Sequence, residues 1–208
     1  MKIASSFRNV ALLASFLLTI FPPISRAQDQ RPANKVLGRV DFVGHTKLEK
    51  TAGVWVDGQY VGYVDELKND KEVLLLPGKH QLSIRQTGYM DQDQDVEVSP
   101  GGATQVAVAL QANPKAEFSA VNAQVKLSVT PDRAAVMVDG KFAGIVHDFG
   151  GVGRSMLVAP GKHHVVIDLV GYQPFETDID VQANQKMTIK TDLVQGSVSD
   201  TAPALKKK

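Results

Sequence analysis

The chain has 208 residues, with 23 lysines and arginines against 22 aspartates and glutamates, so its net charge is close to zero. A net charge near zero argues against nucleic-acid binding, for which a basic stripe is typical, and we expect no nucleic-acid partner. The chain contains no cysteine, which excludes disulfides and an anchor attached through cysteine.

The first 27 residues have the layout of a secretory signal peptide. Two basic residues precede an apolar run from Val10 to Phe21, and Ser25 and Ala27 are small residues of the kind that a signal peptidase reads. The run is shorter than the roughly 20 residues that a membrane helix needs. We predict a signal-peptide helix over residues 1–27, cleaved after Ala27, a linker over residues 28–34, and no stable membrane span after cleavage. An uncleaved anchor is the alternative.

Cleavage would remove three of the 23 basic residues and none of the 22 acidic ones, which leaves a net charge of −2. We therefore expect an exported protein, periplasmic or extracellular, that is not a lipoprotein because it has no cysteine.

Much of the remaining sequence is an internal repeat of two copies. AGVWVDGQYVG at residues 52–62 returns as AAVMVDGKFAG at residues 134–144, and LLLPGKHQLSIRQTGY at residues 74–89 returns as LVAPGKHHVVIDLVGY at residues 157–172. The period of about 80 residues is longer than the 20 to 50 residues of solenoid repeats. Each copy is therefore predicted to be a small domain.

Within each copy, apolar and polar residues alternate, which indicates β-strands. A first strand is expected at residues 36–43 in one copy and at residues 125–129 in the other. Each copy then has an Asp-Gly pair that fits a type I′ hairpin turn and a Pro-Gly pair that fits a type II turn. These pairs are Asp57-Gly58, Asp139-Gly140, Pro77-Gly78 and Pro160-Gly161.

Many short strands, separated by glycine and proline and without an amphipathic helix after the leader, indicate an all-β protein of two tandem small β-sandwich domains. The first sandwich is expected over residues 35–110 and the second over residues 124–194. Residues 111–123 are predicted to be a linker, and residues 195–208 a flexible tail.

The pattern A-x-V-x-V-D-G-x-x-x-G, followed by P-G-K-H, then G-Y and a closing strand that ends in leucine, resembles the PEGA domain family in both copies. No literal Pro-Glu-Gly-Ala stretch is present. The resemblance implies a noncatalytic extracytoplasmic module, similar to carboxypeptidase regulatory-like sandwiches, and it implies no ligand or cofactor.

The histidines of the repeated P-G-K-H stretch are candidate functional residues. His80 shares the strand parity of Leu82 and Ile84, so we expect its ring to point inward and to bond turn carbonyls. A metal or acid/base role for His80 and His163 is the alternative. His163 and His164 are adjacent in a strand, point to opposite faces and cannot bind one metal together.

Two further motifs contain residues that could form a site. His147-Asp148 has no counterpart in the first copy and no nucleophile at a telling spacing, so we predict no catalytic residues. DQDQDVE at residues 91–97 has acidic residues at calcium-loop spacing but lacks the later glycine and glutamate of such a loop. We read it as a charged, solvated strand, and we predict neither a metal nor a cofactor.

An aromatic pair is the remaining candidate for ligand contact. In a two-residue hairpin Trp55 lies across from Tyr60, on the face away from the core valines, and Met137 and Phe142 hold the same places in the second copy. Such a pair could stack on a sugar ring or a partner side chain. It could equally be covered by the other copy or by the first strand of its own copy.

These observations favour an exported noncatalytic structural or interaction module of the cell envelope, whose partner is an envelope protein or polysaccharide. The alternative is a glycan-binding module that uses Trp55 and Tyr60.

Overall fold

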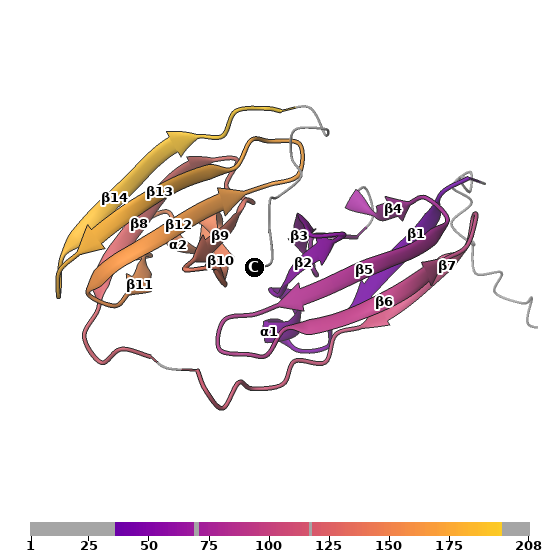
Figure 1. The fold of residues 1–208 in the computed structure, drawn as a ribbon, viewed down its shortest axis with the longest axis horizontal. Coiled ribbons are helices and arrows are strands. Elements are labelled where there is room, and N and C mark those ends of the chain that lie inside the picture. Colours follow the sequence, from indigo (N-terminus) through magenta and orange to yellow (C-terminus); the bar gives the residue numbers. More distant parts are fainter. Residues whose placement is uncertain (1–35, 69–70, 117, 197–208) are drawn as a thin grey trace, which may run out of the picture. The chain divides into compact units, whose positions relative to one another are not determined.

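The computed structural model describes residues 36–68, 71–116 and 118–196, which form two β-sandwiches (Figure 1). The predicted all-β fold is confirmed. The described residues belong to one compact unit. The predicted signal peptide, the linker over residues 28–34 and residues 197–208 of the predicted tail lie outside the described residues. The predicted tail begins too early at residue 195, because Gln195 forms a β-bridge with Tyr172 and the amide of Gly196 donates to the carbonyl of Gly171 at 3.1 Å. Within the described part of the chain, no helix has the length and apolar character of a membrane span.

The first sandwich consists of a three-stranded and a four-stranded sheet, with strand orders β4-β1-β7 and β3-β2-β5-β6. A short helix, α1 (Lys47–Lys50), follows the first strand. The strands are β1 (Gly38–Val43), β2 (Gly53–Val56), β3 (Gln59–Tyr63), β4 (Val73–Leu75), β5 (Gly78–Arg85), β6 (Gln92–Val98) and β7 (Ala103–Ala107).

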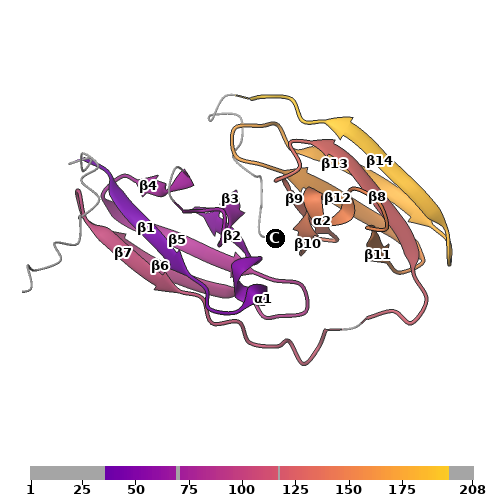
Figure 2. The ribbon, with the colours of Figure 1, turned by 180° about the vertical axis from the view of Figure 1, so that it is seen from behind.

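The second sandwich repeats this topology, with strand orders β11-β8-β14 and β10-β9-β12-β13. Its short helix, α2 (Val146–Phe149), instead follows the third strand of the copy. Figure 2 shows α2 from the other side. The strands are β8 (Ala123–Thr130), β9 (Ala135–Val138), β10 (Lys141–Ile145), β11 (Met156–Val158), β12 (Gly161–Asp168), β13 (Phe175–Val181) and β14 (Lys186–Asp192).

Alternation along the strands builds the two cores, as the sequence predicts. In β8 every second side chain, from Ala123 to Val129, is buried, and the residues between them are exposed. Val54, Leu82 and Ile84 are fully buried in the first core. Because one face of each strand is apolar, the two sheets of each copy must stack face to face to remove it from water.

The predicted hairpin turns are confirmed in both copies. Asp57 and Gly58 have φ of 51° and 83°, and Asp139 and Gly140 have φ of 51° and 75°. A type I′ turn requires positive φ at both central residues, a conformation that aspartate and glycine tolerate. The turn chemistry is therefore fixed by the local sequence.

The predicted type II turns at the Pro-Gly pairs are only partly correct. Gly78 and Gly161 have positive φ, but at 138° and 131°, whereas the third residue of a type II turn has φ of about 80°. Each glycine is already the first residue of a strand, and Gly78 pairs with Val98 in the ladder. The stretched backbone of that pairing opens the turn.

The predicted linker is shorter than expected at both ends. Tyr89 forms a β-bridge with Ala112, and the amide of Asn113 donates to the carbonyl of Gly88 at 3.0 Å, so residues 111–113 lie on the first sandwich. At the other end, Ala123 is buried and pairs with Val158 at the start of β8. Both corrections arise from pairing with strands distant in sequence.

Candidate functional site

The aromatic pair has the predicted hairpin geometry but not an open face. Trp55 of β2 lies across from Tyr60 of β3, with ring centroids 5.1 Å apart. Only 5% of Trp55 and none of Tyr60 is exposed. A sugar ring needs a free aromatic face for stacking, so an exposed stacking platform does not describe this structure.

The second sandwich covers the pair. Phe142 of β10 packs edge-on against Trp55, with centroids 5.2 Å apart and an interplanar angle of 83°. Trp55 and Tyr60 pack with the core of the second sandwich, against which Met137 also packs. The guanidinium of Arg85 lies 4.7 Å from the centre of the Trp55 ring. The sequence left open whether the pair is exposed, covered by the other copy or covered by the first strand of its own copy. In the structure the other copy covers it.

Hydrogen bonds between the copies are reciprocal. The Thr87 hydroxyl donates to the carbonyls of Phe142 and Ala143, at 3.0 and 2.8 Å. The amide of Val170 donates to the carbonyl of Tyr60 at 3.2 Å. In the repeat, Thr87 corresponds to Val170 and Tyr60 to Phe142. Each copy therefore uses the same turn to contact the same strand of the other, as in a two-fold symmetric dimer.

An ion pair between a half-buried arginine and a buried glutamate lies beside this contact. Arg133, from the loop between β8 and β9, donates from Nη2 to the carbonyl of Val61 at 3.0 Å, and its Nε lies 2.8 Å from Oε1 of Glu66. The Nε–H is not aimed at that oxygen, so the attraction there is between charges. Glu66, whose side chain is 5% exposed, is also paired with Lys71.

The Tyr60 hydroxyl completes the contact. It donates to the carbonyl of Arg133 at 3.3 Å. Burial is the largest cause that raises the pKa of Tyr60, followed by the nearby Glu66 charge. The hydroxyl therefore stays protonated and remains a donor at physiological pH. Sequence reasoning missed Arg133 and Glu66, because no repeated or spaced pattern links a loop of one copy to a loop of the other.

The repeated histidines have the predicted structural role. His80 Nε2 bonds the carbonyl of Leu76 at 2.8 Å, and His163 Nε2 bonds that of Ala159 at 2.9 Å. Both carbonyls immediately precede the proline of a Pro-Gly pair. Each ring therefore holds the bend that leads into its own strand.

The other ring nitrogen binds an aspartate that sequence reasoning did not connect to it. His80 Nδ1 lies 2.7 Å from Asp57 Oδ2, and His163 Nδ1 lies 2.7 Å from Asp139 Oδ2. These are the aspartates of the two hairpin turns. Their hydrogen bonds are the largest cause that raises the pKa of each histidine. The aspartate and the histidine are each repeated in both copies, and this joint repetition was the sequence signal that could have indicated their contact.

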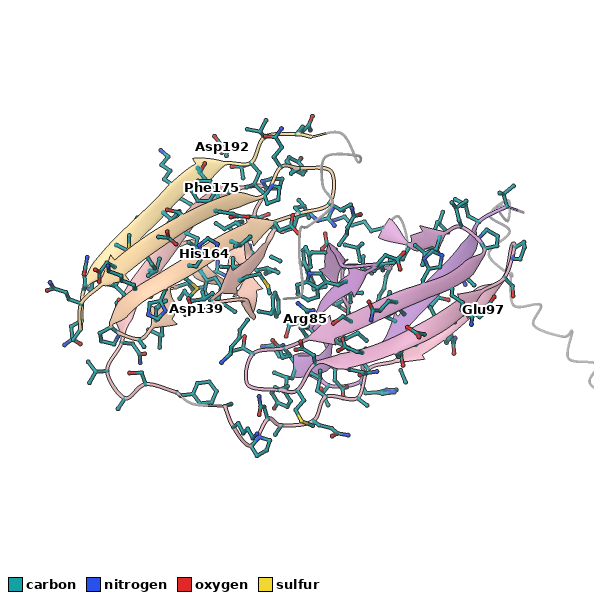
Figure 3. The ribbon with its side chains drawn as sticks, viewed as in Figure 1. Arg85, Glu97, Asp139, His164, Phe175 and Asp192 are labelled. Carbon is teal, nitrogen blue, oxygen red and sulfur yellow. The ribbon has the colours of Figure 1, made fainter. Side chains whose placement is uncertain are left out.

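The second oxygen of each aspartate also binds backbone. Asp139 Oδ1 accepts from the amide of His164 at 2.9 Å, and Asp57 Oδ1 accepts from that of Gln81 at 3.0 Å. Figure 3 labels Asp139 at its turn and His164 on β12. Each Asp-His pair thus ties a hairpin turn to the start of the neighbouring strand, a structural role in both copies.

The other sequence candidates also have structural partners. His147 Nδ1 lies 3.1 Å from Asp132, with both side chains exposed, and Asp148 accepts from the amide of Ile145 at 3.3 Å. His164, on the outer face, pairs with Asp178 at 2.8 Å. In β6 the acidic residues are exposed and alternate with half-buried or buried residues. Among the described residues, no three His, Asp or Glu side chains are grouped as a metal site would require.

Two solved structures are distantly similar to this chain. The Bacillus anthracis TIE protein is 14% identical, with a TM-score of 0.27, over 77% of this chain and 34% of that one. The Bacteroides ovatus protein SGBP-B, solved with a mixed-linkage heptasaccharide, is 12% identical, with a TM-score of 0.17, over 76% of this chain and 44% of that one. This chain thus spans less than half of either protein.

A search of curated proteins finds no match. A scan of protein families does find one, and it falls on the second sandwich. That match begins at β8, includes the Asp139–His163 pair and runs past the end of β14. Residues 123–197 match the family described as the PEGA domain.

Proposed function

We propose that this protein is an exported, noncatalytic structural or interaction module of the cell envelope, in which two PEGA-like sandwiches act as a single body. The observation that carries this proposal is the reciprocal contact between the copies. Trp55 and Phe142 are buried there, and the hydrogen bonds of Thr87 and Val170 lie on either side. Burial of two large aromatic side chains is typical of permanent interfaces.

We further propose that the first sandwich is a second PEGA-like domain. It has the same strand order, the same hairpin turn and the same Asp-His pair as residues 123–197. The polar side chains common to both copies hold turns in place. A noncatalytic role accounts for their repetition, because a duplicated turn clamp serves each fold separately.

Export is tested by expressing the full chain with a C-terminal tag in a bacterial host. We expect the protein in the exported fraction, with an N-terminus at Gln28 because cleavage follows Ala27. A chain that starts with Met followed by Gln28 is the matched control and should remain in the cytoplasm. Full-length protein retained in the cytoplasmic fraction would contradict the proposal.

The glycan-binding alternative predicts a different spectroscopic result. Trp55 is the only tryptophan, and its burial should give a blue-shifted emission that added envelope polysaccharide leaves unchanged. Quenching by acrylamide should be weak, and it should become strong after denaturation in urea. A red-shifted emission that moves on titration with polysaccharide would restore the alternative at Trp55 and Tyr60.

A further inference from the structure

A groove with three basic side chains lies on the outer face of the second sandwich. It has a volume of about 440 Å³ and is formed by β8, β14 and the segment after α2. Lys126 comes from β8, Lys186 from β14 and Arg154 from that segment. The strands β8 and β14 are paired, and Figure 2 shows them next to each other.

The strand register explains why these cations share one face. β8 and β14 are parallel neighbours, with Thr188 paired to Lys126 and Lys186 paired to Gln124. These four residues are all exposed, and they alternate along their strands with residues that are buried or half-buried. Lys126 and Lys186 therefore lie on the outer face. Lys190 is exposed on the same face of β14, about 13 Å from Lys186 at 3.3 Å per residue. The basic groups therefore follow the strand direction.

The segment after α2 brings the third cation to the groove. Gly151 has φ of 84°, and a Cβ added there would lie 3.2 Å from Nη2 of Arg154. The guanidinium of Arg154 thus lies close to the backbone of Gly151, in space that the side chain of any other residue at position 151 would restrict. This Gly-Gly-Val-Gly-Arg stretch occurs in the second copy, and the first copy has no corresponding sequence.

These cations are not used by the fold. Among the ion pairs of the described residues, none includes Lys126, Arg154 or Lys186. Like charges that share a face without partners repel one another, so they cost stability. A bound anion would remove that repulsion.

The equivalent face of the first sandwich shows the contrast. Its basic residue, Arg39 of β1, is paired with Asp41 and with Glu72. Ala103 of β7 stands where the second copy has Lys186, as the strand registers show. The basic groove is therefore a property of one copy and does not follow from the shared fold.

We propose that this groove binds an acidic polysaccharide, with its carboxylates on Lys126, Arg154 and Lys186. Hydroxyl and amide groups of Thr188, Ser155 and Gln124 also line the groove and suit sugar hydroxyls. An acidic protein partner would be expected to find a large apolar or aromatic anchor, and nucleic acid an aromatic stacking residue. No aromatic side chain lines the groove, and its one large apolar lining residue, Met187, is half-buried, so polar and basic groups dominate the lining.

The inference rests on the proposed interaction role and names its partner class. It is tested by calorimetric titration of the mature chain, residues 28–208, with polygalacturonate, with neutral dextran and with poly-L-glutamate. We expect polygalacturonate to bind more tightly than poly-L-glutamate. Its affinity should fall severalfold between about 0.02 M and about 0.2 M salt because charges are screened. Dextran should not bind.

The triple variant Lys126→Gln, Arg154→Gln, Lys186→Gln should lose at least about tenfold in affinity, since each charge-assisted contact is lost. The control variant Lys79→Gln, Lys115→Gln, Lys141→Gln removes the same charge at exposed sites elsewhere and should bind normally. The control variant should keep the unfolding midpoint of the unsubstituted chain, and the groove variant should match or slightly exceed it because repulsion among the three cations is removed.

Three outcomes would overturn the site. Polygalacturonate does not bind, the groove variant binds it as tightly as the unsubstituted chain, or the control variant loses as much affinity as the groove variant. Tighter binding of poly-L-glutamate would replace the polysaccharide with an acidic protein. Because the titration uses purified mature chain, its failure leaves the export result untouched, and a failure of export leaves the titration untouched.

Discussion

Trp55→Ala is expected to lower the free energy of unfolding by about 3–5 kcal/mol, the usual cost of truncating a buried aromatic side chain. The substitution removes the ring that packs on both Tyr60 and Phe142 and leaves a cavity where the copies meet. Urea denaturation followed by circular dichroism measures the loss, since the variant has no tryptophan to follow.

Met137→Ala is the matched control for this prediction. Met137 holds the repeat position of Trp55, but it is only partly buried, against the second core, so its truncation should cost about 2 kcal/mol, the low end for buried aliphatic side chains. Trp55→Phe keeps an aromatic ring and should fall between the two. If Trp55→Ala cost less than Met137→Ala, the contact between the copies would not exist in solution.

Asp139→Ala is expected to cost about 2–3 kcal/mol, because it removes a charge-assisted hydrogen bond and places alanine in the left-handed region. The carboxylate bonds the ring of His163 and the amide of His164, and its own φ is 51°. Asp139→Asn is the control. Asparagine tolerates this conformation and keeps an accepting oxygen, so its cost should be smaller by about 1 kcal/mol, the worth of one neutral hydrogen bond.

The same pair makes stability depend on pH. The bond to Asp139 raises the pKa of His163 above its usual 6.5, so its stabilisation is full below that value and is lost as pH rises through the raised pKa. The bond to His163 lowers the pKa of Asp139 below 3.8, so its contribution is present above that value and is lost as pH falls through the lowered pKa. Unfolding free energy should therefore decline from pH 6 to pH 8.

Denaturation at several pH values checks this slope. Asp139→Asn should reduce it, and the double variant Asp57→Asn, Asp139→Asn should reduce it further, because the bond to Asp57 also raises the pKa of His80. The remaining slope is expected from His164, whose pKa is raised by its bond to Asp178. An unchanged slope in the double variant would mean that other groups set the pH dependence.

Local chemistry made much of the fold predictable. Asp57-Gly58 specifies a type I′ turn whatever surrounds it, and the parity of His80 with Leu82 directs its ring inward. Strand alternation placed the cores for the same reason, since a period of two is written into the residues themselves. These features depend on neighbours within a few positions along the chain.

The contacts that sequence reasoning missed all join distant segments. Nothing near Arg133 indicates that Glu66 is its partner, and nothing near Trp55 decides between a sugar and Phe142 as the group that covers it. The bond between Asp57 and His80 crosses a strand pairing whose register had to be known first. The departure of Gly78 from type II geometry likewise follows from its pairing with Val98.

The reciprocal contact has a consequence for how the two halves diverge. The strands of Tyr60 and Phe142 and the turns of Thr87 and Val170, which meet there, belong to segments that are repeated in both copies. Sheets turned away from the contact are released from that constraint. One has neutralised its arginine with acidic neighbours, while the other has gathered lysines and acquired a glycine-rich loop. The two outer sheets therefore differ in charge although the sandwiches that carry them share one strand order.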